Sequence, residues 1–245
     1  PSSHLTAGGP QDAPDGGIDV RIEAPRTIGS SGYIPRGRTG IQVKASKMPP
    51  QALIKEMAPR GMLRDSIRDL VTTGGAYVVA CSKASPSDTR LAAARTAMSA
   101  AVGGVTVHPD AVLDFLGADR IALWCRRHPG VVAWARHAVG RPIEGWSSFA
   151  NWSRPDEGVS PEFLLDKDAR VVDERTPHDG PLSVEEGIAR LRGLASKPGE
   201  AIRLIGLSGV GKTRLAQALF DARVGEAALP PSKVLYCDFG LPASP

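Results

Sequence analysis

The sequence predicts an α/β chain built in two parts. Short apolar or alternating runs typical of strands take turns with longer runs of helical periodicity, and one glycine-rich loop stands between such a strand and a helix. With 42% hydrophobic and 23% charged residues among 245, the chain has the composition of folded globular domains. Between residues 141 and 180, proline, glycine, serine and charged residues dominate, and we expect a linker there.

The first part, residues 18–140, follows a segment at residues 1–17 that is rich in glycine, proline and aspartate and is expected to be flexible. Its strands are predicted from alternation or from buried apolar runs, and its helices from length and apolar spacing. Ser87 is an expected N-cap. In chain order we expect strands at 18–23 and 41–44, a helix at 50–71 interrupted near 59–61, a strand at 75–82, a helix at 87–101, and a short strand followed by helix within 104–139.

The second part, residues 181–245, opens on a predicted helix. Ser183 and Glu186 have the spacing of a capping box, in which each residue satisfies a main-chain N–H group of the other. We therefore expect a helix from this point to about residue 196. The later elements are expected to be a strand at 201–205, a helix at 211–222 and a strand at 233–238.

Residues 206–213 have the sequence GLSGVGKT, which matches the pattern G-x-x-x-x-G-K-[ST] between a predicted strand and a predicted helix. Glycines let main-chain N–H groups surround phosphate oxygens, and the start of the helix adds donors and positive potential. Lys212 is expected to reach the β- and γ-phosphates of a nucleotide, and the Thr213 hydroxyl to ligate Mg²⁺. The expected nucleotide-binding residues are Gly206, Ser208, Gly209, Gly211, Lys212 and Thr213.

Only 32 residues follow Thr213, which is enough for one helix and one strand. A parallel sheet of this kind needs further strands to bury its faces, so we expect only the start of a P-loop NTPase domain here. Asp238 ends the last predicted strand. It is a candidate for the acidic residue that orders Mg²⁺ and water, and an ordinary strand end is the alternative.

Charge and cysteine content limit the class of protein. Residues 1–140 hold 17 Lys and Arg against 11 Asp and Glu, whereas the rest of the chain holds 13 against 15. The basic first part favours a polyanionic partner. There is no apolar run long enough to predict a membrane span. The cysteines are too widely spaced for a disulfide framework or a zinc pattern, which favours a reducing cytoplasm: Cys81, Cys125 and Cys237.

Two strands of the first part carry polar residues at alternate positions. Asp19 and Glu23 share one face of the first strand, and Gln42 and Lys44 share one face of the second, with apolar residues opposite. If the strands pair, these side chains gather on one surface. Their oxygens, with the carbonyl group of Val43, would hold Mg²⁺, and Lys44 would position water or stabilise developing phosphate charge. An ordinary half-solvated strand pair is the alternative.

The stretch GGIDVRIE…GIQVKAS, followed by a helix and an apolar strand, resembles the PD-(D/E)XK nuclease superfamily, and within it the Mrr-like restriction endonucleases. The resemblance implies a restriction-endonuclease-like core, a mixed sheet with flanking helices, that cleaves DNA with Mg²⁺. It gives Asp19 the role of the metal-ligand aspartate, Gln42 the position of the motif's glutamate, and Lys44 that of its lysine. Gln42 is a variant found in Mrr-like members, and it removes a negative charge. The family's preceding helix is not visible before residue 18.

Joined to the GLSGVGKT loop, this first part resembles the front of an antiviral STAND NTPase of the Avs type, over about residues 15–240. The resemblance implies ATP binding, a homo-oligomer that is a tetramer in the intact protein, and activation by a phage protein. The phage protein would bind a C-terminal sensor that lies outside this sequence. The substrate would be double-stranded DNA in the cytoplasm, with no membrane involved.

Two other functions fit the same residues. In an NTP-dependent type IV restriction enzyme, the motor would move along modified DNA. In a regulatory switch, the nuclease-like fold would have lost catalysis and would bind only DNA or a protein, which the uncharged Gln42 favours. The basic residues Arg36, Arg38 and Lys47 flank the proposed centre, and they would either hold DNA phosphates or form a solvated loop.

Overall fold

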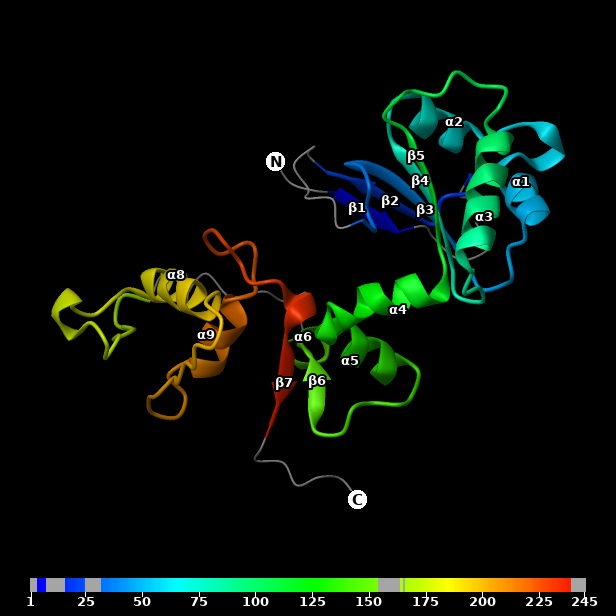
Figure 1. Ribbon diagram of the computed structural model, residues 1–245. Coiled ribbons are helices and arrows are strands. Elements are labelled where there is room, and N and C mark those ends of the chain that lie inside the picture. The colour runs from blue at the N-terminus through cyan, green and yellow to red at the C-terminus, as the bar shows by residue number, and fades with distance from the viewer. Residues whose placement is uncertain (1–3, 8–15, 25–31, 154–163, 165, 239–245) are drawn as a thin grey trace. The chain divides into compact units, whose positions relative to one another are not determined.

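The contacts of the chain divide it into two compact units, Pro1–Trp124 and Cys125–Pro245, and each is described by itself (Figure 1). The division lies ahead of the linker expected at 141–180, and helix α4 (Ala118–Arg126) runs across it. The computed structural model describes residues 4–7, 16–24, 32–153, 164 and 166–238. Most of the segment expected to be flexible, residues 1–17, lies outside the described residues, but residues 4–7 form a strand, so the expectation is wrong for them.

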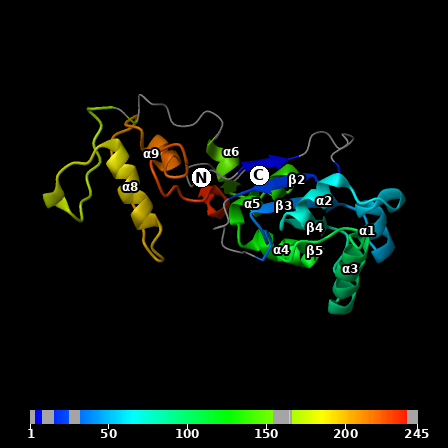
Figure 2. The same cartoon turned by 90° about the horizontal axis from the view of Figure 1, so that it is seen from above.

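A mixed sheet forms the centre of the first unit, as the sequence predicts. Antiparallel pairing joins β1 to β2 and β2 to β3, whereas β3, β4 and β5 run parallel. Figure 2 shows β2 to β5 side by side from above. In spatial order the strands are β1 (His4–Ala7), β2 (Val20–Glu23), β3 (Arg38–Lys44), β4 (Ala76–Cys81) and β5 (Val112–Leu116).

Parallel strands need long crossovers, and helices supply them here. The predicted helix at 50–71 is two helices, α1 (Pro50–Met57) and α2 (Asp65–Thr72), separated by the 3-10 turn η1 (Pro59–Gly61). Arg60 and Gly61 have φ angles of 58° and 77°, which no α-helix accommodates, so the predicted interruption is confirmed with its cause. Helix α3 (Asp88–Ala101) crosses from β4 to β5. It begins after Ser87, as predicted, but the Ser87 side chain makes no capping hydrogen bond.

Both faces of this sheet are covered. Helices α1, α2 and α3 lie together on one face (Figure 1), where Leu53, Ile67 and Met98 pack with the strand residues Tyr77 and Val79. A smaller cluster lies on the other face and is joined by the first half of α4. Its members are Ile22, Tyr33, Ile41, Val78 and Leu116, with Ile121 and Trp124 of α4 packed against them.

One face assignment from the sequence is wrong. Alternation predicts Ile18 on the same side as Val20 and Ile22, but Ile18 belongs to the helix-covered cluster, whereas Ile22 belongs to the other. The reason is local: β2 begins at Val20, and the chain bends at Asp19, so the two-residue period does not extend back to Ile18.

The described part of the second unit holds a small two-stranded sheet and several helices. Strands β6 (Trp146–Ser148) and β7 (Leu235–Cys237) pair antiparallel, although about 90 residues separate them along the chain. A buried cluster centred on Ile188 and Leu215 joins α8 to α9. The helical elements are α5 (Pro129–Ala138), α6 (Phe149–Ser153), η2 (Pro177–Asp179), α8 (Val184–Ala195), α9 (Lys212–Ala218) and η3 (Pro231–Lys233).

The capping box that predicts the start of α8 is present, since Ser183 Oγ accepts from Glu186 N at 3.2 Å and the Glu186 carboxylate accepts from Ser183 N at 2.8 Å. The prediction of a strand at 201–205 is wrong, because these residues belong to no strand of the structure. Within the described part of this unit, β7 pairs with β6 and not with residues 201–205, so the apolar run lacks a ladder to join. Among the described residues, no helix is long and apolar enough to cross a membrane.

Candidate functional site

Asp19, the residue just before β2, lies beside Gln42 of the neighbouring strand β3. The register pairs Val20 with Ile41, and Asp19 N donates to Ile41 O at 2.9 Å, which brings Asp19 beside Gln42. Gln42 Nε2 donates to Asp19 Oδ2 at 2.7 Å, and the main-chain N–H of Val43 donates to the same oxygen. The structure therefore brings together three of the residues that the sequence analysis singled out.

Gln42 is buried, contrary to the half-solvated surface that the alternation predicts. Only 4% of the residue is exposed, whereas Val43, expected to face inward, is 53% exposed. The cause is the crowded sheet face beside α2. At Gly40, two residues earlier on the same face, an added Cβ would stand 2.7 Å from Leu70 Cδ1 and 2.8 Å from Ile18 Cδ1. Gln42 thus lies in an enclosed position between packed helix and sheet.

The carbonyl oxygen of the Gln42 side chain is an orphaned buried atom. Its Nε2 is committed to Asp19, and Oε1 has no hydrogen-bond partner among the described residues although it is shielded from solvent. Leaving a buried polar atom unpaired costs about 1–3 kcal/mol, so native structures nearly always give such an atom a partner. The position calls for a donor or a cation beside Gln42 Oε1 and the Asp19 carboxylate.

Lys44 stands at the end of β3, two residues beyond Gln42, and pairs with a residue that the sequence analysis did not single out. Its Nζ lies 3.0 Å from Glu56 Oε1 of helix α1, and both side chains are about one-fifth exposed. Arg64 NH2 lies 3.7 Å from the same carboxylate oxygen. No sequence signal marked Glu56, because it lies on a helix whose distance from β3 only the fold determines.

Other residues expected near this centre lie elsewhere or have other partners. Glu23 pairs with Arg38 in the strand register, at the end of β2 opposite to Asp19. Arg38 forms an ion pair with Asp69 at 2.7 Å, and Arg36 Nε donates to Asp110 O at 2.7 Å. These two arginines are thus engaged within the unit. Among the described residues, no group of three or more His, Cys, Asp and Glu side chains is placed to hold a metal ion.

The glycine-rich loop at 206–213 has the backbone that its glycines permit. Gly209 and Gly211 have φ angles of 83° and 89°, in the left-handed region that other residues avoid, and Gly211 caps the start of α9. Lys212 Nζ folds back on the loop and donates to Gly206 O at 2.8 Å and Leu207 O at 2.6 Å. The Thr213 and Ser208 residues are exposed. The helix is shorter than predicted and ends at Ala218.

A cavity of about 500 Å³ adjoins this loop within the second unit. Val210, Gly211 and Lys212 form one side of it, and Val171 and Leu191 lie on others. Charged residues also line it, among them Asp173, Arg175 and Arg190. The arginines hold the pKa of the Asp173 carboxyl below its usual range, chiefly through the hydrogen bond from Arg190.

Asp238, the candidate acidic partner of the loop, ends a strand that pairs with β6. Tyr236 Oη donates to Asp238 Oδ2 at 3.3 Å, and the Tyr236 ring stacks on Trp152 with centroids 4.5 Å apart. Burial, together with the negative charge of Asp238, raises the pKa of Tyr236. The described contacts therefore tie Asp238 to the β6–β7 sheet.

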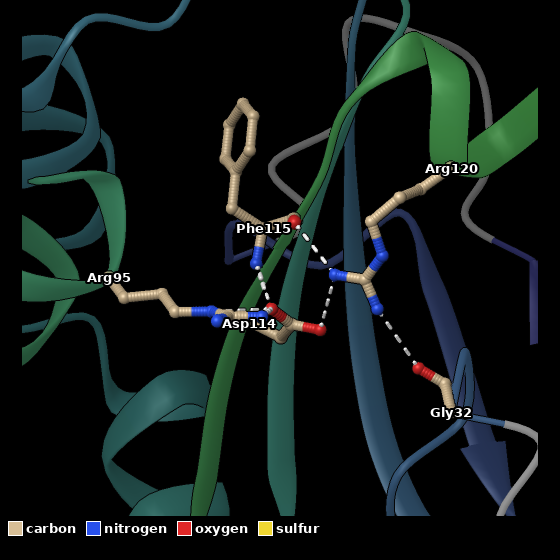
Figure 3. A network of polar contacts seen from close by, with 5 residues as sticks. All are labelled: Gly32, Arg95, Asp114, Phe115 and Arg120. Carbon is tan, nitrogen blue, oxygen red and sulfur yellow. Dashed lines mark hydrogen bonds and ion pairs between the residues drawn. The ribbon is translucent and has the colours of Figure 1, made fainter. Parts of the chain in front are cut away.

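A second polar cluster in the first unit surrounds Asp114 of β5, which the sequence analysis passed over as part of a strand. Figure 3 shows Arg95 and Arg120 approaching its carboxylate from opposite sides. Arg95 NH2 lies 2.8 Å from Oδ1 and Arg120 NH1 lies 3.0 Å from Oδ2, while Phe115 N also donates to Oδ1. Arg120 further donates to Gly32 O at 3.3 Å. The cluster ties α3 and α4 to β5.

Arg192 of α8 is almost wholly buried, with 2% of its surface exposed. Among the described residues, its guanidinium donates to main-chain carbonyl groups around the end of α9. Burial lowers the pKa of this guanidinium, an effect that Asp221 opposes. The five acceptors are the carbonyl oxygens of Ala218, Leu219, Asp221, Val224 and Glu226.

No protein family, no curated protein and no solved structure matches the chain. The function proposed below accordingly depends on the residues and contacts described above.

Proposed function

We propose that this chain is the nuclease effector and the start of the ATP-binding module of a STAND-type antiphage defence protein. The first unit would act as an Mg²⁺-dependent DNA endonuclease with the restriction-endonuclease-like fold of Mrr-like enzymes. The observation that carries the proposal is the hydrogen-bonded pair of the partly buried Asp19 and the buried Gln42, with Gln42 Oε1 unpaired among the described residues and Lys44 two positions further on.

The donor set at this pair fits Mg²⁺, which prefers oxygen ligands. Asp19 would supply a carboxylate oxygen, Gln42 its orphaned Oε1, and Val43 its main-chain carbonyl group. When bound, Mg²⁺ would activate water and neutralise charge on the phosphate group under attack. Gln42 lowers the charge of the ligand set by one relative to a glutamate, so the cation would be held less tightly than at a site with two carboxylates.

The chain's own residues supply the other parts of the reaction. Asp19 Oδ2 is held by Gln42 Nε2 and Val43 N, so its carboxylate is fixed before any ligand arrives. Lys44 presents an ammonium group whose charge suits a DNA phosphate and the negative charge that develops during hydrolysis. In this arrangement Lys44 would orient the phosphodiester, and Asp19 would orient the cation and its water.

Nucleotide binding by the second unit is the second element of the proposal. The positive φ angles of Gly209 and Gly211 preset the loop, and Lys212 Nζ, now bonded to the loop's own carbonyl groups, would move to the phosphate oxygens of ATP. Thr213 would contribute a hydroxyl ligand to Mg²⁺. The adjoining cavity of about 500 Å³ is within the size range of small-ligand sites and would take the rest of the nucleotide.

In the intact protein, ATP binding would support assembly into a homo-oligomer after a C-terminal sensor detects a phage protein. Assembly would pair nuclease units so that both strands of double-stranded DNA are cut, in the cytoplasm. An NTP-dependent type IV restriction enzyme would use the same two sites. It differs in its trigger, because modified DNA, and not a phage protein, would stimulate its ATPase activity.

A binding-only switch is the alternative from a different class. It is favoured by the absence, among the described residues, of any cluster of three metal-binding His, Cys, Asp or Glu side chains. In that case Gln42 Oε1 would be satisfied by an ordered water, and Lys44 would contact DNA or a protein without cleavage. This alternative and the nuclease differ in one measurable property, which is a specific cation site beside Asp19.

A Mn²⁺ titration followed by electron paramagnetic resonance measures that property directly. We expect one specific site in the wild-type chain, lost in Asp19→Asn and weakened in Gln42→Leu. Glu23→Gln is the matched control, because it removes a carboxylate from the other end of β2 and should leave the site intact. No specific site in the wild type, or a site that survives Asp19→Asn, contradicts the nuclease proposal.

A further inference from the structure

We propose that Glu56 is a positioning residue for Lys44, and that Arg64 holds Glu56 in place. This inference rests on the proposed nuclease function, because it assigns a role to a residue beside that centre. Lys44 Nζ and Glu56 Oε1 are 3.0 Å apart, and the two side chains are only 23% and 21% exposed. Solvent therefore screens this pair less than it screens an exposed surface pair.

Arg64 fixes Glu56 from two directions. Its Nε donates to the main-chain carbonyl of Glu56 at 2.8 Å, at the end of α1, and its NH2 lies 3.7 Å from Glu56 Oε1. Because Arg64 holds it in this way, the Glu56 carboxylate cannot easily change its position when the Lys44 side chain moves. The ammonium of Lys44 is instead drawn to a position that the helix determines.

Arg64 also packs against the main chain at Gly17, two residues before Asp19. A Cβ at Gly17 would stand only 2.6 Å from Arg64 Cδ, so the main chain of Gly17 approaches Arg64 as closely as a glycine allows. Tyr77 Oη donates to Gly17 O at 3.2 Å and keeps this segment in place from the sheet side. Arg64 thus contacts both the segment before Asp19 and the partner of Lys44.

This arrangement has a consequence for ligand binding. Lys44 has four rotatable bonds, and a free lysine would lose much conformational freedom on meeting a phosphate. Glu56 orders the side chain beforehand. Two cations, Lys44 and Arg64, share one carboxylate, so the group keeps a net positive charge that an incoming phosphate can use. Glu56 therefore orients the ammonium without neutralising the site.

Chemical labelling of lysines tests the positioning without metal or DNA. The full chain is treated briefly with acetic anhydride, and acetylation at each lysine is quantified by mass spectrometry. We expect Glu56→Gln to raise labelling of Lys44 about fivefold, since an amine released from a half-buried ion pair becomes accessible. Lys55, exposed on the same helix, serves as the internal reference. Asp69→Asn is the matched control, because it removes an ion pair at the other end of β3.

Plasmid cleavage gives the second readout. If the wild type cleaves DNA, Glu56→Gln should lower kcat about tenfold with little change in KM, and Glu56→Asp should restore part of the loss. Unchanged labelling of Lys44 in Glu56→Gln overturns the inference, as does cleavage at the wild-type rate by that variant. Failure of the nuclease proposal is distinguishable, because it appears as a wild type without a Mn²⁺ site and does not depend on the labelling of Lys44.

Discussion

The buried guanidinium of Arg192 provides a test of how the second unit is held together. Arg192→Met puts a long apolar side chain in place of the arginine and removes all five hydrogen bonds to carbonyl groups around the end of α9. Three of these acceptors, the carbonyls of Ala218, Leu219 and Asp221, also accept a main-chain N–H. Among the described residues, the other two acceptors have no second donor.

The magnitude follows from those two acceptors, the carbonyl oxygens of Val224 and Glu226. Val224 is buried, so leaving its carbonyl unpaired costs about 1–3 kcal/mol, whereas Glu226 is exposed and water can bond its carbonyl. Methionine also avoids the desolvation that lowers the pKa of Arg192, and this gain offsets part of the loss. We therefore expect Arg192→Met to reduce the free energy of unfolding by about 2 kcal/mol.

Urea denaturation of the full chain, followed by circular dichroism and tryptophan fluorescence, measures this change. Arg190→Met on the same helix is the matched control. Arg190 pairs with Asp173 through a side chain that is 44% exposed, so its loss should cost under about 1 kcal/mol. If Arg192→Met unfolds at the same urea concentration as Arg190→Met, the carbonyl-binding role of Arg192 is refuted.

Three further predictions concern other contacts. Asp114→Ala leaves two arginines facing each other without their shared carboxylate and should destabilise the first unit by about 2–4 kcal/mol, measured by the same denaturation; a loss under about 1 kcal/mol would contradict the cluster's role. The hydrogen bonds from Ser183 hold the pKa of Glu186 below its usual range, so their stabilisation is present near neutral pH and is lost as pH falls through the folded-state value. Wild-type stability should therefore fall below about pH 4.3 more steeply than that of Glu186→Gln, and equal slopes would show that the box contributes nothing. Lys212→Ala should abolish ATP binding in isothermal titration calorimetry, and wild-type affinity in that variant would remove the phosphate-binding assignment.

Much of the first unit could be predicted from the sequence because its signals are local. Strict alternation located β2 and β3, and the Pro-Arg-Gly sequence at residues 59–61 located the break between α1 and α2. The strand register then placed Asp19 beside Gln42, as expected for two paired strands. The alternation pattern was therefore sufficient to predict which residues lie close together when both are on neighbouring strands.

Burial could not be predicted in the same way. Alternation describes a strand with one wet face. In the structure Gln42 is on the helix-covered face and is enclosed, whereas Val43, near the end of β3 on the opposite face, is 53% exposed. Glu56 was missed because its contact with Lys44 depends on how α1 packs on the sheet. Long-range packing decides these positions, and no spacing in one sequence reports it.

In the second unit, fewer of the predictions from local sequence patterns are confirmed. The capping box of α8 is a local signal and is confirmed, but the apolar run at 201–205 belongs to no strand. A strand forms only where another strand offers its hydrogen-bonding edge, and propensity alone cannot supply that edge. Arg192 gave no sequence signal, because an arginine on a helix is usually solvated.

Plasmid cleavage in Mg²⁺ by the wild-type chain and by Lys44→Ala at high protein concentration tests the central claim most directly. The nuclease account predicts that the wild type nicks or linearises the plasmid and that Lys44→Ala, like Asp19→Ala, does not. Equal cleavage by the wild type and Lys44→Ala would contradict the assignment of the centre to Asp19, Gln42 and Lys44.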